Sequence, residues 1–288
     1  MRLSPATLTG ALAILLWAGL ALLTAASGEV PPFQLAALTF AIGGLVGLAY
    51  AAARGKLAAL RQPWRFWLHG AGGLFAYHAL YFAALRNAPP AQAGLIAYLW
   101  PLLIVLFAGL LPGERLTARH ILGALIGLAG VGVLLLSGGA GAVFETRYAS
   151  GYACALAAAF VWAGYSVLSR RFSGVPTEAV AGFCLATAAL AALCHVLFET
   201  TLWPQGAGQW SAVLGLGAGP VGLAFYVWDV GMKQGDIKLL GVASYAAPVL
   251  STLLLVAAGF AAPSLALGLA CALIVGGALA ASGQGRTK

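Results

Sequence analysis

Charged residues are scarce in this sequence. Aspartate, glutamate, lysine and arginine together make up 8% of the 288 residues, whereas 62% of the residues are hydrophobic. Soluble domains carry about 25% charged residues, so this chain lacks the polar groups that would cover a surface facing water. The composition excludes a soluble globular domain and predicts an integral membrane protein surrounded by the lipid bilayer.

Catalytic and metal-binding motifs are also missing. The four cysteines lie singly in apolar runs, with no CxxC pair and no Cys/His ligand spacing, so we interpret them as small buried side chains. There is no HExxH motif and no pair of aspartates at the centre of an apolar run. We therefore expect no metal site, no cofactor and no enzymatic activity.

Long apolar runs account for nearly the whole chain. A membrane-spanning helix needs about 20 apolar residues. Ten such runs are present, separated by short connections that carry proline, glycine or charge, and we expect an all-α membrane protein with ten transmembrane helices. The runs are approximately 5–26, 32–53, 64–86, 89–111, 119–137, 149–169, 176–198, 209–232, 237–259 and 263–282.

The basic residues indicate how these helices are oriented. On a ten-helix map one side of the membrane holds thirteen of the fifteen lysines and arginines, including Arg2, Arg286 and Lys288, and the other side holds only Arg86 and Arg147. The positive-inside rule then places both termini in the cytoplasm. The net charge of +8 is thus a topology signal and not evidence of nucleic-acid binding.

The first run resembles a signal peptide in part, but its length favours an uncleaved span.

The two halves of the chain repeat one another. A glycine, a tyrosine and a proline at helical spacing in the fourth run recur 147 residues later in the ninth, pairing Gly94 with Gly241, Tyr98 with Tyr245 and Pro101 with Pro248. Proline within an apolar helix frees a carbonyl and bends the helix, and the glycines would let neighbouring helices close against each other.

Two further matches support the repeat. Trp17-Ala18-Gly19 recurs as Trp162-Ala163-Gly164, and Ser137-Gly138 recurs as Ser282-Gly283, both 145 residues later. We therefore predict two five-helix repeats, residues 1–140 and 141–288. Five is an odd number, so the second repeat would cross the membrane in the opposite direction. Inverted repeats with a site at the midplane are characteristic of secondary transporters.

Aromatic and hydroxyl side chains lie deep in several runs, far from the interfaces where tryptophan and tyrosine normally anchor helices. Each could simply fill a gap between small residues, but together on matched helices they indicate a cavity that binds a small solute. The residues expected to line this cavity are Trp17, His78, Tyr81, Tyr98, Trp100, Trp162, Tyr165, Ser244 and Tyr245.

The third and eighth runs supply candidate gates on opposite sides of the membrane, since the repeat would be inverted. These candidates are Tyr77, Phe225, Trp228 and Asp229. Asp229 precedes Lys233 by four residues, so an ion pair that extends to the cytoplasmic interface explains it, with a gate or an ammonium contact as alternatives. His78 is either a neutral packing residue or a group that titrates near neutral pH.

The sequence resembles the drug/metabolite transporter superfamily in its ten-helix EamA-type branch, over essentially the whole chain. Within that branch it is similar to the YddG family of aromatic amino acid exporters. The matching stretches are Leu16-Trp17, Tyr98-Leu99-Trp100-Pro101, Pro112–Thr117, Trp162-Ala163-Gly164-Tyr165, Trp228-Asp229-Val230-Gly231 and Ser244–Ser251.

This resemblance implies export of aromatic and other apolar amino acids, and of toxic cations such as viologens, across a bacterial inner membrane. Asp229 stands where that family leads us to expect asparagine. An exporter of another metabolite, such as a purine or an amine, is the alternative, followed by an intramembrane protein that transports nothing. We expect a functional monomer.

Overall fold

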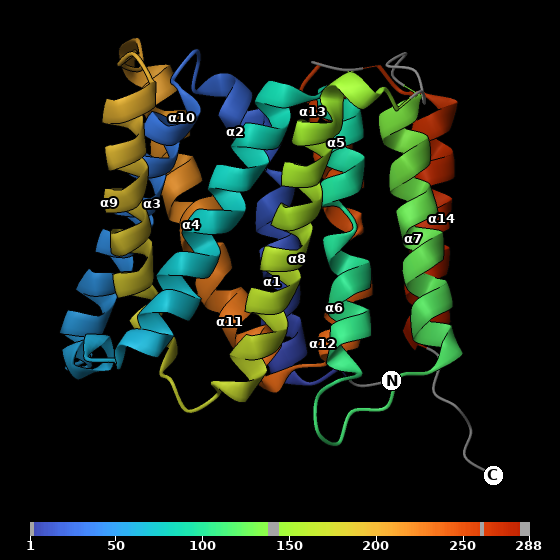
Figure 1. Cartoon of the computed structure of the whole chain (residues 1–288), viewed down its shortest axis with the longest axis horizontal. Helices are drawn as coiled ribbons and strands as arrows, with labels where there is room; N and C mark the ends of the chain where they lie inside the picture. The colour runs from blue at the N-terminus through green and yellow to red at the C-terminus, as the bar shows by residue number, and fades with distance from the viewer. Residues whose placement is uncertain (1–2, 138–143, 260–261, 283–288) are drawn as a thin grey trace.

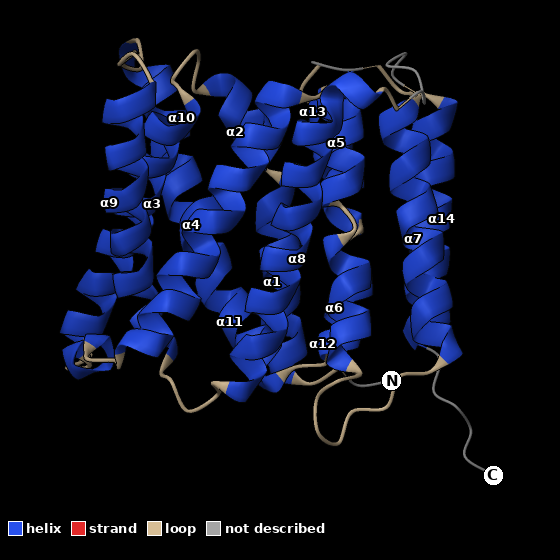
Figure 2. Cartoon of the chain, in the orientation of Figure 1, coloured by secondary structure: helices blue, strands red, loops and turns tan. Residues whose placement is uncertain are grey.

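The computed structural model describes residues 3–137, 144–259 and 262–282, and within these ranges the chain is helical and contains no strand (Figures 1 and 2). Arg2, Gly138, Gly283, Arg286, Lys288 and the predicted repeat boundary at 140–141 lie outside the described residues. The helices stand roughly side by side. The connections lie at the two ends, which are called the upper and lower ends as Figure 1 draws them.

Helices cover every predicted apolar run. In the first half they are α1 (Pro5–Ala18), α2 (Leu20–Ala26), α3 (Pro32–Ala53), α4 (Trp64–Asn87), α5 (Pro90–Ala97), α6 (Trp100–Ala108) and α7 (Ala118–Leu136). In the second half they are α8 (Ala149–Arg171), α9 (Val180–Phe198), α10 (Gly206–Ala218), the π-helical turn η4 (Gly219–Leu223), α11 (Ala224–Gln234), α12 (Ile237–Ala243), α13 (Ala246–Ala257) and α14 (Leu265–Ser282). Short 3₁₀ turns occupy Leu57–Leu60, Thr146–Tyr148 and Thr177–Ala179.

Eight helical segments of the described chain are long and apolar enough to cross a membrane, and the apolar part of α14, Leu265–Ala281, is shorter. Helix α4 has 24 residues, which is a sufficient length, but its histidines, tyrosines and glycines lower its mean hydropathy. The chain is therefore an all-helical membrane protein.

Two of the predicted runs are interrupted where proline requires it. Pro101 cannot donate a hydrogen bond to the carbonyl of Ala97, and α5 ends at Ala97. Pro248 likewise cannot bond the carbonyl of Ser244, and α12 ends one residue earlier, at Ala243. The carbonyl of Ser244 instead accepts the N–H of Ala247 at 3.1 Å. The predicted kinks are thus complete breaks in the helices.

Helices pack in pairs that join the two halves of the chain. Helix α1 lies along α11, α3 along α9, α4 along α8 and α7 along α14. Glycines allow the closest approaches: a Cβ on Gly10 of α1 would lie 2.8 Å from the Cα of Gly231 in α11. A Cβ on Gly123 of α7 would lie 2.5 Å from the carbonyl oxygen of Gly277 in α14. Small residues therefore decide which helices are neighbours.

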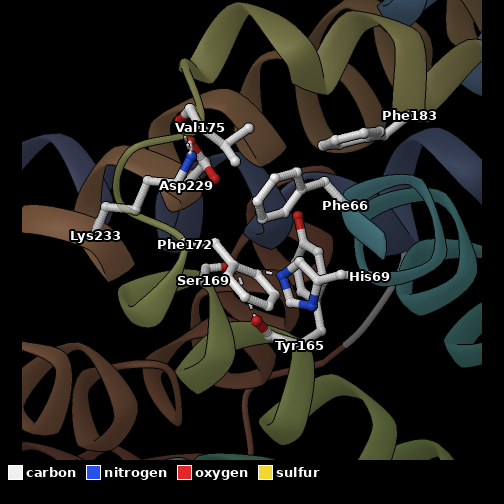
Figure 3. Close-up of a pocket in the computed structure, with 9 residues that line it drawn as sticks. All are labelled: Phe66, His69, Tyr165, Ser169, Phe172, Val175, Phe183, Asp229 and Lys233. Atoms are coloured by element: carbon white, nitrogen blue, oxygen red, sulfur yellow. Dashed lines mark hydrogen bonds and ion pairs between the residues drawn. The ribbon is translucent and has the colours of Figure 1, made fainter. Parts of the chain in front are cut away.

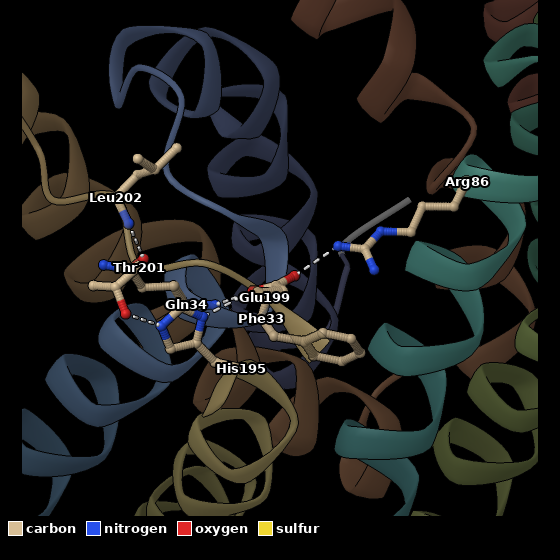
Figure 4. Close-up of polar contacts among 7 residues, drawn as sticks. All are labelled: Phe33, Gln34, Arg86, His195, Glu199, Thr201 and Leu202. Carbon is tan, nitrogen blue, oxygen red and sulfur yellow. Dashed lines mark hydrogen bonds and ion pairs between the residues drawn. The ribbon is translucent and has the colours of Figure 1, made fainter. Parts of the chain in front are cut away.

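A buried carboxylate joins three helices at the upper end (Figure 4). The Glu199 side chain is only 2% exposed. It accepts main-chain N–H bonds from Phe33 and Gln34 at the start of α3, each at 3.1 Å, and receives Arg86 of α4 at 2.9 Å. His195 of α9 contacts it at 3.0 Å. A carboxylate is favourable at a helix N-terminus, so Glu199 fixes the upper ends of α3, α4 and α9 relative to one another.

Candidate functional site

A cavity of about 130 Å³ lies between the middle of the molecule and its upper end. None of the described residues that line it is an aspartate, glutamate, lysine or arginine. The lining comes from both halves of the chain and consists of Trp17, Leu20, Tyr77, His78, Tyr81, Ala97, Tyr98, Trp100, Trp162, Pro220, Val221, Phe225 and Ala247. The cavity is therefore uncharged and largely aromatic.

Trp17 of α1 is the central ring of this site. Its centroid lies 6.3 Å from that of Trp100 and 5.8 Å from that of Trp162, in edge-to-face contacts. Below these rings Trp228 approaches Trp17 to 5.1 Å and is almost fully buried. Such contacts favour a rigid arrangement, because each aromatic pair contributes about 0.5–1.5 kcal/mol beyond burial. The indole rings form the floor of the cavity.

The π-helical turn η4 places main chain in the cavity wall. Pro220 cannot continue the α-helical hydrogen bonding of α10, and the chain widens over Gly219–Leu223. The indole N–H of Trp17 donates to the carbonyl of Pro220 at 3.1 Å. This bond satisfies a carbonyl at the irregular turn, as helix distortion inside a membrane requires.

Helix α4 supplies three polar side chains of the cavity, Tyr77, His78 and Tyr81. The rings of Tyr77 and Tyr81 are stacked 6.0 Å apart, and Tyr77 lies 5.0 Å from Trp162. The Nδ1 atom of His78 is 2.7 Å from the carbonyl of Leu74. A carbonyl can only accept, so Nδ1 carries the proton, and in a neutral ring Nε2 is an acceptor. The His78 ring is thus held by the main chain of its own helix through Nδ1, and it provides a hydrogen-bond acceptor, Nε2, at the cavity wall.

Six of the nine residues predicted for the cavity line it: Trp17, His78, Tyr81, Tyr98, Trp100 and Trp162. Two residues predicted as gates, Tyr77 and Phe225, line it as well. Phe225 stacks on Phe40 with the ring centroids 5.5 Å apart, so in this structure it is part of the cavity wall.

Tyr165, Ser244 and Tyr245, which were also predicted for the cavity, do not line it in this structure. Tyr165 is one turn beyond Trp162, towards the lower end, and stacks on His69 at 5.0 Å. The Ser244 hydroxyl, directly after the end of α12, donates to the carbonyl of Leu240 at 2.7 Å. The Tyr245 ring is fully buried. Helical periodicity indicates the face of a helix on which a residue lies, but it does not indicate how deep along the helix the cavity is.

Trp228 and Asp229 lie beneath the cavity floor. The indole N–H of Trp228 donates to the Ser166 hydroxyl at 3.1 Å. The predicted ion pair is made, with Lys233 Nζ 2.7 Å from Asp229 Oδ2, and it is buried inside the protein: Asp229 is 5% exposed and Lys233 is 7% exposed. The segment between α8 and α9 lies against the pair and binds both Asp229 and Lys233.

That segment is joined to α11 by two further bonds, and Figure 3 draws Val175, Asp229 and Lys233 among the residues that meet here. Thr177 donates its hydroxyl proton to Asp229 at 2.6 Å, and Lys233 donates to the carbonyl of Val175 at 2.7 Å. Nearby, His69 Nε2 lies 3.1 Å from the Ser169 hydroxyl, which itself donates to the Tyr165 carbonyl. The void among these residues is only about 10 Å³, hardly enough for one water molecule. Little space is therefore left in this part of the lower end.

The matched glycines have different surroundings. A Cβ on Gly241 of α12 would lie 3.1 Å from Ile104 and 3.2 Å from the carbonyl of Pro101, so α12 packs tightly on α6. The nearest atom to a Cβ on Gly94 of α5 would be Leu135 Cδ1, at 3.6 Å. The helix pair in the lower half is in close contact, whereas Gly94 in the upper half has room.

Sequence reasoning missed five lining residues: Leu20, Ala97, Pro220, Val221 and Ala247. One signal could have found part of this set, because Pro220 lies within the eighth apolar run just as Pro101 and Pro248 lie within the fourth and ninth. The other four are ordinary apolar residues. Their place in the wall follows from the helix breaks and from packing.

Comparison with known proteins identifies the family. The model of the EamA-like transporter family matches residues 4–136 and again residues 149–283. The chain belongs to this family. It is a membrane transporter and not an enzyme.

Individual relatives are similar over nearly the whole length. A protein of Ancylobacter novellus named "Aromatic amino acid exporter YddG" is 65% identical over 98% of each chain. A protein of Salmonella typhimurium with the same name is 30% identical over 88% of each chain. A solved crystal structure is 65% identical, with a TM-score of 0.95 over 98% of this chain and 97% of the other. The transporter is therefore similar to the solved structure in both fold and sequence, and to the two named exporters in sequence.

Proposed function

We propose that this transporter exports aromatic and other apolar amino acids, and also toxic cations such as viologens, across a bacterial inner membrane. The observation that carries the proposal is the uncharged aromatic cavity above the floor formed by Trp17, Trp100 and Trp162. Relatives that bear the name of aromatic amino acid exporters support the substrate class.

The cavity offers suitable chemistry for a zwitterion with an apolar side chain. Indole and phenol rings can stack on that side chain and attract an ammonium group over their faces. The Nε2 atom of a neutral His78 is an acceptor for the same ammonium group. Trp100 and Ala247, at the N-termini of α6 and α13, line the cavity where helix dipoles favour a carboxylate. The phosphates of a sugar nucleotide would find no lysine or arginine in this lining.

The architecture that we propose has ten spans in two oppositely oriented repeats, residues 1–140 and 141–288. The double family match and the paired breaks before Pro101 and Pro248 support the repeats. Arg54, Lys238 and most other basic residues of the described chain lie at the lower end, in connections or in the helix turns next to them. The positive-inside rule would make that end cytoplasmic and would place both termini there.

The transport mechanism that we propose is alternating access. The closed network around Asp229 and the tight contact at Gly241 support an outward-open state, with the cavity facing the upper side. In the opposite state, the packing of the two repeats would be exchanged, and Gly94 would be the glycine in close contact. One chain lines the whole cavity, so a monomer would be sufficient for function.

Counterflow in proteoliposomes tests the function. Purified protein would be reconstituted, and uptake of labelled phenylalanine, threonine and methionine would be measured with and without a pH gradient. We expect saturable uptake that does not depend on the gradient, and competition by methyl viologen. Absence of uptake of all three amino acids would reject the substrate class. Uptake only in the presence of a gradient would instead point to proton coupling, with His78 and Asp229 as the first residues to examine.

A further inference from the structure

The two tyrosines of the repeated Gly-x-x-x-Tyr-x-x-Pro pattern occupy different environments. Tyr245 lies at the break between α12 and α13 and is fully buried. Its hydroxyl accepts the main-chain N–H of Leu102 at 3.2 Å. Leu102 follows Pro101 in the first turn of α6, where the helix break leaves N–H groups without partners in their own helix. Tyr245 therefore caps the inner half-helix of the other repeat.

Tyr98, its counterpart, lies at the break between α5 and α6 and lines the cavity. The residue that matches Leu102 in the second repeat is Val249, which follows Pro248 in the first turn of α13. Val249 and Tyr245 belong to one buried cluster, and Tyr98 packs against the edge of that same cluster. Tyr98 thus already packs against the cluster that contains Val249, the residue that matches Leu102.

From this asymmetry we infer that Tyr98 and Tyr245 exchange roles in the transport cycle. In the state described here, Tyr245 caps α6 and Tyr98 presents its hydroxyl to the solute. In the opposite state Tyr98 caps α13 at the N–H of Val249, and Tyr245 presents its hydroxyl to a cavity open at the lower end. The inference rests on the inverted repeat of the proposed function and assigns Ser244 and Tyr245 to the cytoplasm-facing form of the site.

Packing around Tyr245 shows how closely this arrangement is fitted. A Cβ on Gly127 of α7 would lie 2.5 Å from the Tyr245 ring, so only glycine leaves room for the seated tyrosine. A Cβ on Gly241, one turn earlier in α12, would touch the carbonyl of Pro101 at 3.2 Å. The capped state therefore brings α12 against α6 at the same place where the hydroxyl reaches Leu102. Releasing Tyr245 and separating these two helices would be one movement.

Matched substitutions test the exchange. Tyr245→Phe removes the cap of the state described here, and Tyr98→Phe removes the cap of the opposite state. Both variants lose one hydroxyl on a buried ring. The expected effects are opposite shifts of the conformational equilibrium, each by about two- to tenfold, as expected for one net hydrogen bond. Tyr245→Phe would favour the cytoplasm-open state, and Tyr98→Phe the outward-open state.

Cysteine reactivity reads out the equilibrium in a variant that lacks the four native cysteines. Tyr81→Cys reports the cavity described here, since Tyr81 lines it and is partly exposed. Ser244→Cys reports the opposite cavity, since Ser244 does not line the cavity in this state and is fully buried. Labelling by a water-soluble maleimide in detergent would be followed for both reporters. Tyr245→Phe should raise labelling at Ser244→Cys and lower it at Tyr81→Cys, and Tyr98→Phe should do the reverse.

Shifts in the same direction for both phenylalanine variants, or no shift in either, would overturn the exchange. Gly127→Ala is a second route to the same answer, because its methyl group displaces the Tyr245 ring without altering a hydroxyl. Gly127→Ala should change the labelling of the two reporters in the same direction as Tyr245→Phe does. A change in the direction expected for Tyr98→Phe would contradict the proposal. No substrate is present in these measurements. Failure of amino acid uptake and failure of the exchange would therefore be separate results.

Discussion

The indole N–H of Trp17 donates a hydrogen bond to the main-chain carbonyl of Pro220, 3.1 Å away and 203 residues later in the chain. This bond ties the central ring of the cavity floor to the one π-helical turn of the described residues. Trp17 also contacts Trp100, Trp162 and Trp228, so a single residue connects the wall, the floor and the closed region below. The cavity is consequently a single unit whose parts should respond together to substitution.

Replacing Trp17 by phenylalanine tests this connection. The variant keeps an aromatic ring but leaves the Pro220 carbonyl without its donor, which costs about 1–3 kcal/mol for a buried polar group. We expect uptake of phenylalanine to fall several-fold while the protein remains folded. Counterflow rates and size-exclusion profiles would measure the two properties. Trp203→Phe is the matched control, because Trp203 is 56% exposed and its ring partner is Trp210. Equal loss in both variants would refute a specific role for Trp17.

Alanine at Trp100 or Trp162 tests the floor itself. Each substitution removes an aromatic surface that faces the cavity, worth about 0.5–1.5 kcal/mol per ring contact with an aromatic solute. Transport should fall by about three- to tenfold or more, without loss of folded protein in the membrane. The measurement is uptake at equal amounts of reconstituted protein. Unchanged flux in either variant would remove that residue from the site.

The buried ion pair at the lower end should be important for stability. Asp229→Asn leaves the Lys233 ammonium in a buried site without its counter-ion, and breaking such a pair costs about 3–5 kcal/mol. We expect a clear drop in the thermal unfolding midpoint in detergent, and partial recovery in the double variant Asp229→Asn with Lys233→Met. Glu145→Gln is the control, since the Glu145–Arg147 pair is exposed and should contribute little. A smaller loss for Asp229→Asn than for the control would contradict the assignment.

Glu199 should have a comparable role at the upper end. Glu199→Gln replaces an acceptor-only group with an amide whose NH₂ faces the donors of Phe33, Gln34 and Arg86. The expected loss is about 1–3 kcal/mol in the free energy of unfolding. Arg86→Ala should cost less, because the Arg86 side chain is 50% exposed. Thermal unfolding of both variants would measure the two losses. A larger loss for Arg86→Ala than for Glu199→Gln would show that the ion pair contributes more to stability than the bonds at the N-terminus of α3.

The matched glycines give a direct test of alternating access. Gly94→Ala adds a methyl group where the nearest atom is 3.6 Å away, so stability of the state described here should not change. If Gly94 enters a close contact in the opposite state, this variant should still lose transport. Gly241→Ala should lower both transport and stability, since its methyl group meets Ile104 at 3.1 Å. Full activity of Gly94→Ala, measured by counterflow, would argue against exchange of the two helix contacts.

Much of the site could be predicted because its signals are local. Trp17, Trp100 and Trp162 are recognisable as cavity candidates from their depth in apolar runs, and Pro101 and Pro248 mark helix breaks by covalent structure alone. Leu20 and Ala97 could not be predicted, because an apolar residue facing a cavity looks the same in the sequence as one facing lipid. Tyr165 and Tyr245 have the same chemistry as Tyr81 and Tyr98. Only their depth relative to the cavity separates them.

Composition and periodicity depend only on the order of the residues, and they are sufficient to predict an apolar helical membrane protein with a doubled Gly-x-x-x-Tyr-x-x-Pro pattern. They do not show which copy of that pattern is packed and which copy faces the cavity, because that depends on contacts made only in the folded protein. Tyr98 and Tyr245 are equivalent in the chain, but one hydroxyl binds Leu102 and the other ring lines the cavity. If the two halves packed identically, both tyrosines would have the same environment. The difference between them therefore arises from contacts between helices that are distant in the sequence.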